Sequence, residues 1–224
     1  TLEHRILFGY YPDVVNNPGE EQDILTELIS SYLFKDLLML GNIRKPYILE
    51  KLVKALALQI SNEVSYNELA STVGVDKNTI SKYIDLLEKA FVIFSLQSYS
   101  GNFRRELKRS KKLYFWDTGI RNAIINNFNP LELRQDKGAL WENYIISERL
   151  KYMNNSQKRV NSYFWRTTQH QEIDYVEEKA GKLFAFEIKW NPKAKVKEPK
   201  NFLYAYPGSD FQVVNNQNFI NFIM

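Results

Sequence analysis

Glu172-Ile173-Asp174-Tyr175-Val176 alternates polar and apolar side chains, and Phe184-Ala185-Phe186-Glu187-Ile188-Lys189-Trp190 follows it after a glycine-containing turn. Each stretch predicts a β-strand, and the turn predicts that the two strands form a hairpin. Because side chains alternate along a strand, Glu187 and Lys189 share one face of the second strand. The hairpin would bring Asp174 close to Glu187.

A glutamate and a lysine within a strongly apolar strand are costly to bury unless they are paired or bound to a metal. Asp174 and Glu187 would together hold a divalent cation, which polarises a phosphodiester and lowers the pKa of a bound water. Lys189 would orient that water or stabilise the charge that develops during the reaction. Two alternatives stay open. Glu187 and Lys189 would otherwise form a simple ion pair worth about 0–1 kcal/mol, and Glu172, on the same face as Asp174, is the alternative ligand.

The composition restricts the metal and the compartment. There is no cysteine, and His4 and His170 are the two histidines, so disulfides, thiolate sites and a histidine-rich zinc site are excluded. Oxygen ligands favour Mg²⁺ or Mn²⁺. No stretch approaches about 18 consecutive apolar residues and no signal peptide opens the sequence, so we expect a cytoplasmic protein without a membrane partner. The net charge of +4 permits a nucleic-acid partner without requiring one.

The predicted elements divide the 224 residues into four parts. These are a helical linker at 1–45, a winged helix-turn-helix at 46–117, a connector with a short helix at 118–137, and an α/β domain at 138–224. The last part is expected to contain a helix at 138–153 and strands at 160–166, 172–177, 183–190 and 211–214. We therefore expect an α/β protein in which a helical winged-helix region precedes a domain with a mixed central sheet.

Residues 65–90 predict the helix-turn-helix. Ser65 and Glu68 form a capping box at the start of its first helix, Gly74 lies in the turn, and Asp76 is the N-cap of its second helix. The helix is followed by strand-like stretches at 91–96 and 113–116. The loop between these strands would form the wing.

Polar and basic residues of this region predict contact with DNA. Lys77, Asn78, Ser81 and Lys82 lie at the start of the second helix, where they would face base edges. The wing loop carries a basic cluster that would follow the phosphate backbone; it consists of Arg104, Arg105, Lys108, Arg109, Lys111 and Lys112. The alternative is a solvated charged loop on a winged helix that acts as a spacer between proteins.

The spacing of Asp174 from Glu187-Ile188-Lys189 resembles the PD-(D/E)XK nuclease superfamily. The resemblance implies a restriction-endonuclease-like fold, whose order of helix, three strands, helix and strand this sequence follows. It implies that Asp174 and Glu187 are metal ligands and that Lys189 is catalytic. Members of the superfamily often carry a further glutamate on the preceding helix, and Glu142 matches it as a residue that supports a ligand water.

A series of motifs, in order along the whole chain, resembles a prokaryotic AAA+ ATPase family that carries a C-terminal domain of unknown function. The family more often has arginine where this chain has Lys35. The matching segments are 9–15, 32–36, 81–88, 111–119, 138–143, 165–166, 172–175 and 187–189.

This resemblance implies that the ATPase domain lies outside the chain, and the start at Thr1 fits a piece of a longer protein. No G-x-x-x-x-G-K-[ST] motif occurs, so we expect no ATP binding by this piece. The expected partners are DNA, the ATPase domain, and another protein or a second copy of the chain. The expected function is metal-dependent hydrolysis of DNA phosphodiesters, and the alternative is a non-catalytic module that recognises DNA or protein through a retained nuclease fold.

Overall fold

The computed structural model describes residues 1–33, 37, 39, 45–100, 110–169 and 171–224. The chain forms two compact units. The first unit consists of Thr1–Ser95 and Leu113–Leu140, and the second unit consists of Leu96–Lys112 and Trp141–Met224. The segment Leu96–Lys112 therefore belongs with the C-terminal residues, although it lies far from them in the sequence.

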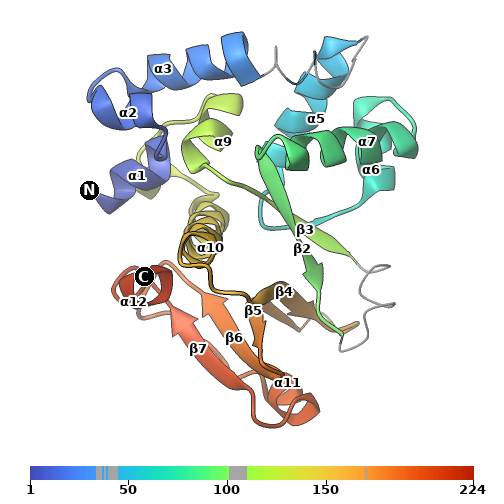
Figure 1. Cartoon of the computed structure of the whole chain (residues 1–224), viewed down its shortest axis with the longest axis vertical. Coiled ribbons are helices and arrows are strands. Elements are labelled where there is room, and N and C mark those ends of the chain that lie inside the picture. Colours follow the sequence, from blue (N-terminus) through green and yellow to red (C-terminus); the bar gives the residue numbers. More distant parts are fainter. Residues whose placement is uncertain (34–36, 38, 40–44, 101–109, 170) are drawn as a thin grey trace. The chain divides into compact units, whose positions relative to one another are not determined.

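The N-terminal part of the first unit is helical. Val14, Leu25, Ile29 and Ile120 form its core, and Figure 1 shows α1, α2 and α3 gathered near α9. Its elements are α1 (Leu2–Phe8), α2 (Pro12–Asn16), α3 (Glu21–Glu27), the π-helix η1 (Leu28–Leu33) and α9 (Thr118–Ile124). The helix predicted from Glu20 is present over α3 and η1, and most of its predicted continuation lies outside the described residues; α1 was not predicted.

The predicted pair of capped helices is present. Ser65 accepts from the Glu68 N–H at the start of α6 (Tyr66–Val73), and Asp76 accepts from the Thr79 N–H at the start of α7 (Lys77–Lys89). Between them Gly74 adopts a left-handed conformation with φ of 86°, which glycine tolerates without a steric cost. α5 (Pro46–Leu58) and β1 (Glu63–Val64) precede this pair.

The first strand after α7 begins two residues later than predicted, and the second begins two residues earlier. β2 spans Ile93–Ser98 and β3 spans Lys111–Phe115. Phe91 was predicted to start the first strand, but it is exposed and has a positive φ of 55° in the turn that follows α7. A strand does not accommodate that backbone conformation.

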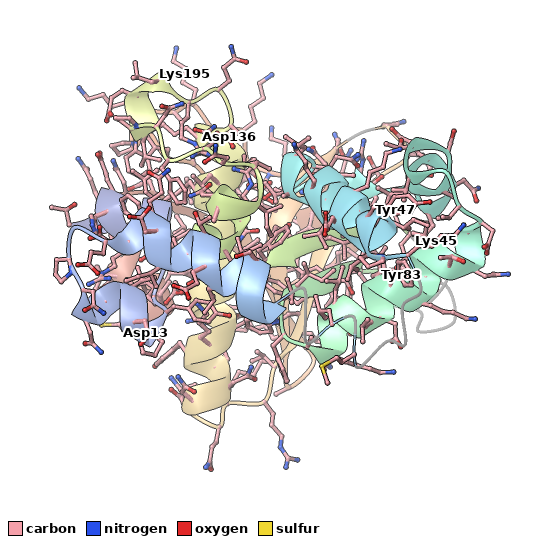
Figure 2. The ribbon with its side chains drawn as sticks, turned by 90° about the horizontal axis from the view of Figure 1, so that it is seen from above. Asp13, Lys45, Tyr47, Tyr83, Asp136 and Lys195 are labelled. Carbon is pink, nitrogen blue, oxygen red and sulfur yellow. The ribbon has the colours of Figure 1, made fainter. Side chains whose placement is uncertain are left out.

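A buried polar network joins α9 to the residues that follow it. Arg121 of α9 donates from Nε to the Ala57 carbonyl over 2.7 Å. Arg121 and Arg134 share Asp136, labelled in Figure 2, with N–O distances of 2.5 and 2.8 Å to its Oδ2. Burial alone would raise the pKa of Asp136, but hydrogen bonds and charge from Arg134 and Arg121 outweigh it and lower this pKa to about 2. Asn122 accepts from both guanidinium groups and donates to the carbonyls of Ile6 and Leu7. The 3-10 helix η2 (Leu131–Leu133) lies within this connector.

The second unit contains the β-hairpin that the sequence predicts. Its strands and helices are β4 (Asn161–Arg166), β5 (Glu172–Lys179), β6 (Lys182–Ile188), α11 (Lys200–Ala205), β7 (Asp210–Val214) and α12 (Ile220–Ile223). β5 pairs antiparallel with β4 and β6, whereas β4 pairs parallel with β2 and β6 pairs parallel with β7. The hydrogen-bonded order is β1-β3-β2-β4-β5-β6-β7, so the predicted mixed sheet is confirmed.

Helices cover the sheet of the second unit. Phe202 of α11 packs on Trp165, Ile173, Val176, Leu183 and Ala185, which form the core on one side. α10 (Lys137–Asn155) is joined to β5 by Arg149, which holds the Glu177 carboxylate with two hydrogen bonds of 2.7 and 2.9 Å. Figure 1 shows β5, β6 and β7 side by side. This sheet positions the candidate site.

Candidate carboxylate site

Asp174 and Glu187 come together through the register of the hairpin. Tyr175 of β5 is paired with Phe186 of β6, so Asp174 and Glu187 are the next residues along these two antiparallel strands. Asp174 is 7% exposed, and its Oδ2 accepts from the Ile188 N–H over 2.8 Å. The structure thus brings the two predicted carboxylates to one place.

Lys189 lies between these two carboxylates. Its Nζ is 2.6 Å from Glu187 Oε1 and 3.4 Å from Asp174 Oδ2. The side chain is 39% exposed, in contrast to the two acids. The ion pair between Glu187 and Lys189 that the sequence offered as an alternative is therefore present, and Asp174 extends it into a three-residue cluster.

The charges in this cluster shift the protonation of its members. Burial, and then the negative charge of Asp174, raise the pKa of Glu187. Burial alone would lower the pKa of Lys189, but the neighbouring carboxylates Asp174 and Glu187 outweigh it and raise this pKa. The two carboxylates therefore repel each other, and a cation between them relieves the repulsion.

Lys112 of β3 is a site residue that the sequence reading missed. Its side chain is 2% exposed, and its Nζ is 2.5 Å from Glu172 Oε1 and 3.4 Å from Glu142 Oε1. Burial alone would lower the pKa of Lys112, but Glu142, Glu172 and Asp174 outweigh it and raise this pKa. Lys112 was counted with the basic wing loop, and this placement is wrong because the side chain is buried among carboxylates. The signal available in the sequence was its position directly before the apolar run Leu113-Tyr114-Phe115.

Glu142 and Glu172 are both engaged by Lys112. Glu142, on α10, contacts this lysine over 3.4 Å. Glu172, the alternative ligand, is also 3.4 Å from the Arg166 guanidinium. Lys112 thus bridges Glu142 and Glu172, and Lys189 bridges Asp174 and Glu187.

The donor atoms of the site suit a hard cation. Among the residues that the structure describes, no group of three or more histidines, aspartates and glutamates is arranged to hold a metal ion. Two carboxylates nevertheless suffice for Mg²⁺, which usually keeps several waters and binds through one or two carboxylates and substrate phosphates. Asp174 and Glu187 fit this requirement, with oxygen as the only donor type.

The residues predicted to bind nucleic acid fall into two groups. Lys77, Asn78, Ser81 and Lys82 are all exposed in the N-terminal half of α7. Arg104, Arg105, Lys108 and Arg109 lie outside the described residues. Their contact with DNA stays a prediction.

Comparison with known proteins identifies the family. A model described as Domain of unknown function (DUF8612) matches residues 1–131, which is more than half of the chain. The chain belongs to the DUF8612 family. In this DUF8612 member, a second model described as Domain of unknown function (DUF4143) matches residues 137–222.

The relatives of this DUF8612 chain are longer than the chain itself. An uncharacterized protein of Mycobacterium tuberculosis is 29% identical over 163 residues, which cover 72% of the chain and 36% of the relative. An uncharacterized protein of Haemophilus influenzae is 26% identical over 208 residues, covering 88% of the chain and 48% of the relative. The chain spans less than half of the length of these relatives. No solved structure matches it.

In the part of the chain that the structure describes, no helix is both long enough and apolar enough to cross a bilayer.

Proposed function

We propose that Asp174 and Glu187 form the metal site of a nuclease module that hydrolyses DNA phosphodiesters, within a longer ATPase-associated protein. One observation carries the proposal: the carboxylates of Glu187 (β6) and Asp174 (β5) both contact the ammonium group of Lys189, at 2.6 and 3.4 Å. A half-buried pair of like charges that requires a cation is the usual basis of divalent metal binding by oxygen ligands. Mg²⁺ or Mn²⁺ is the expected ion.

The residues of the chain have distinct roles in this proposal. A bound divalent ion supplies Lewis-acid chemistry and lowers the pKa of a coordinated water. The Ile188 N–H fixes the orientation of the Asp174 carboxylate. Lys189 keeps its proton at Nζ and is partly exposed, so it is suited to donate a hydrogen bond to a phosphate oxygen as negative charge develops there.

The wider context of the proposal comes from the resemblance to the AAA+ family and from the lengths of the relatives. The ATPase domain, and with it ATP binding, would lie in the part of the protein that this chain does not include. The capped helices α6 and α7 would act as a winged helix that holds DNA. The proposed partners are DNA, the ATPase domain, and a further protein or a second copy.

Cleavage of a plasmid in Mg²⁺ or Mn²⁺, with EDTA as the blank, tests this function. The near-isosteric changes Asp174→Asn, Glu187→Gln and Lys189→Met should each reduce the rate at least ~100-fold, as expected when a group that stabilises the transition state is removed. Asp210→Asn is the matched control, because Asp210 lies on β7 in an exposed ion pair with Lys182. Full activity in both Asp174→Asn and Lys189→Met would exclude this site.

A second function is favoured by the pairing of the site carboxylates with lysines. Lys112 and Lys189 together contact Glu142, Glu172, Asp174 and Glu187. A site whose carboxylates are already paired with lysines suits a non-catalytic module that recognises DNA or protein through the same fold. For this second function, calorimetry should detect no binding of Mn²⁺. DNA binding should depend on salt and should be lost on charge reversal of Arg104, Arg105 and Lys108.

A further inference from the structure

A lysine-rich segment, residues 193–200, follows the strand that carries Glu187. β6 ends at Ile188, at the open end of the β5–β6 hairpin, opposite its turn. The Lys189 N–H donates to the Val214 carbonyl of β7 over 2.9 Å, so the chain leaves the sheet directly beside the carboxylate site. The charged residues of the segment are four lysines and one glutamate: Lys193, Lys195, Lys197, Lys200 and Glu198.

The far end of the segment returns to the other strand of the site. The Asn201 side chain donates to Gln171 Oε1 over 2.7 Å, directly before β5 begins at Glu172. Asp174 lies two residues further along the same strand. The lysine segment is therefore attached at both ends to the open end of the hairpin, where the two site carboxylates lie.

The lysines of the segment face water, and the residues between them face the protein. Lys193, Lys195 (labelled in Figure 2) and Lys197 are exposed, whereas Ala194 and Val196 are half-buried. In the described part of the chain, no carboxylate lies within ion-pair distance of these three lysines or of Lys200, which is also exposed. Their charge is thus available to an anion from outside the chain.

A cavity of about 700 Å³ lies where the segment meets β5. Lys197 and Lys200 line it on one side, and Gln171 and Glu172 line it where β5 begins. Glu172 is already paired with Lys112 at 2.5 Å, so the two lysines of the segment are the unpaired charges around this cavity. The cavity leaves room for a negatively charged group beside the site.

We propose that residues 193–200 bind the phosphodiester backbone of duplex DNA and hold it at the open end of the hairpin. Asp174 and Glu187 alone would repel DNA, and a row of cations beside them offsets this repulsion. Lysines contact phosphates without reading bases, so the segment positions DNA and does not select a sequence. The inference rests on the proposed function for the choice of DNA as the partner, but it concerns binding and requires no cleavage.

Fluorescence anisotropy with a labelled duplex, in EDTA and over a range of salt concentrations, tests this surface. Loss of the four lysines should weaken binding at low salt at least ~10-fold. It should also reduce the slope of log K against log salt by about 3–4, because each phosphate contact contributes roughly 0.9 to it. The variant carries Lys193→Gln, Lys195→Gln, Lys197→Gln and Lys200→Gln.

A matched control removes four cations from the other end of the same sheet. Lys179 and Lys182 are paired beside the hairpin turn, and Lys158 and Arg159 precede β4; all four are exposed. Replacing these four with glutamine should change the slope by less than about 1. Equal losses of affinity and slope in the two quadruple variants would overturn the inference.

A chemical probe tests the position of the bound DNA. The chain contains no cysteine, so a single introduced thiol can carry an iron chelate that cuts nearby DNA through hydroxyl radicals. The chelate should cut a bound duplex from Lys195→Cys but not from Lys179→Cys, each combined with Asp174→Asn to remove hydrolysis by the proposed site. Cutting from Lys179→Cys that equals or exceeds cutting from Lys195→Cys would contradict the proposed surface.

Binding and cleavage separate the inference from the proposed function. If the wild type cleaves no plasmid but the loss of the four segment lysines abolishes DNA binding, the nuclease function fails and the inference stands. If the wild type cleaves DNA and this variant binds and cleaves like the wild type, the inference is wrong and the function stands. The replaced side chains are exposed, so thermal unfolding should show that both quadruple variants are folded.

Discussion

The backbone N–H of Tyr10 donates to Asp117 Oδ2 over 2.8 Å, although 107 positions separate these residues in the sequence. The other oxygen of the same carboxylate accepts from the Ile120 N–H and caps α9. Gly9 and Gly119 allow this close approach, since a Cβ on either would overlap atoms of the opposite segment. Asp117 therefore joins the end of α1 to the start of α9 within the first unit.

Replacing either of these glycines with alanine should strongly destabilise the first unit. In Gly119→Ala the new Cβ would lie 2.2 Å from the Phe8 carbonyl oxygen, and in Gly9→Ala it would lie 2.0 Å from Asp117 Oδ1, at a φ of 72°. We expect each change to lower the free energy of unfolding by about 2–4 kcal/mol, measured by urea denaturation. Gly138→Ala is the control: no atom lies within 4 Å of the added Cβ, and alanine favours the helix by up to about 1 kcal/mol. A Gly119→Ala variant as stable as the wild type would contradict this packing.

The stability of the first unit should fall in acid through Asp136. Its pKa is about 2 in the folded chain against an ordinary value of 3.8. Because the folded pKa is the lower one, the contribution is fully present above about pH 4 and is lost as the pH falls towards 2, by about 1–2 kcal/mol for this partly exposed group. Asp136→Asn should lack this part of the pH dependence and be less stable at pH 7. Urea unfolding between pH 5 and 2 gives the free energy of unfolding against pH for the wild type and for Asp136→Asn. If the two curves run parallel, Asp136 does not have this role.

The paired hydrogen bonds between Arg149 and Glu177 should stabilise the second unit. Glu177 is 4% exposed, so Glu177→Gln leaves the partly buried Arg149 guanidinium without its counter-charge and should cost about 2–4 kcal/mol. Arg149→Lys should also destabilise, because an ammonium cannot form the two parallel bonds. Lys182→Met, which removes the exposed pair with Asp210, should change the free energy by less than about 0.5 kcal/mol. If thermal unfolding shows that Lys182→Met destabilises the protein as much as Glu177→Gln does, burial does not determine how much these ion pairs contribute to stability.

If α7 binds DNA as proposed, its N-terminal lysines should contribute to affinity through phosphate contacts. The double variant Lys77→Ala, Lys82→Ala should weaken binding at low salt and reduce the slope of log K against log salt by about 2. Fluorescence anisotropy with a labelled duplex measures both quantities. Lys89→Ala is the control on the same helix, since Lys89 lies in its last turn and pairs with Asp85. If Lys89→Ala weakens DNA binding as much as the double variant does, the lysines attract DNA only through their general positive charge and α7 has no defined docking surface.

Local signals in the sequence were sufficient for much of the fold. Ser65 and Asp76 cap their helices because the hydrogen bond of a cap spans three residues, so both cap and partner are visible in a short window. The hairpin of β5 and β6 follows from alternation and a turn, and these place Asp174 beside Glu187 without further information.

Features that depend on distant partners were not predictable in this way. In the sequence Lys112 looks like the basic residues before it. Its burial is made tolerable by carboxylates that lie 30 or more positions further along the chain, those of Glu142, Glu172 and Asp174. α1 is seven residues long and buries Ile6 alone, so it carries no periodicity. Phe91 is apolar like its neighbours, but the left-handed turn it forms depends on where α7 ends.

The segment Leu96–Lys112 determines how this protein can be dissected or recombined. The two family models suggest a cut between residues 131 and 137, yet a fragment from 137 onwards would lose the strand that pairs Gln97 and Ser98 with β4. It would also lose Lys112. A transplanted second unit must therefore carry Leu96–Lys112 with it. Gene fusions that exchange these two families between proteins would have to include this segment, which neither family boundary marks.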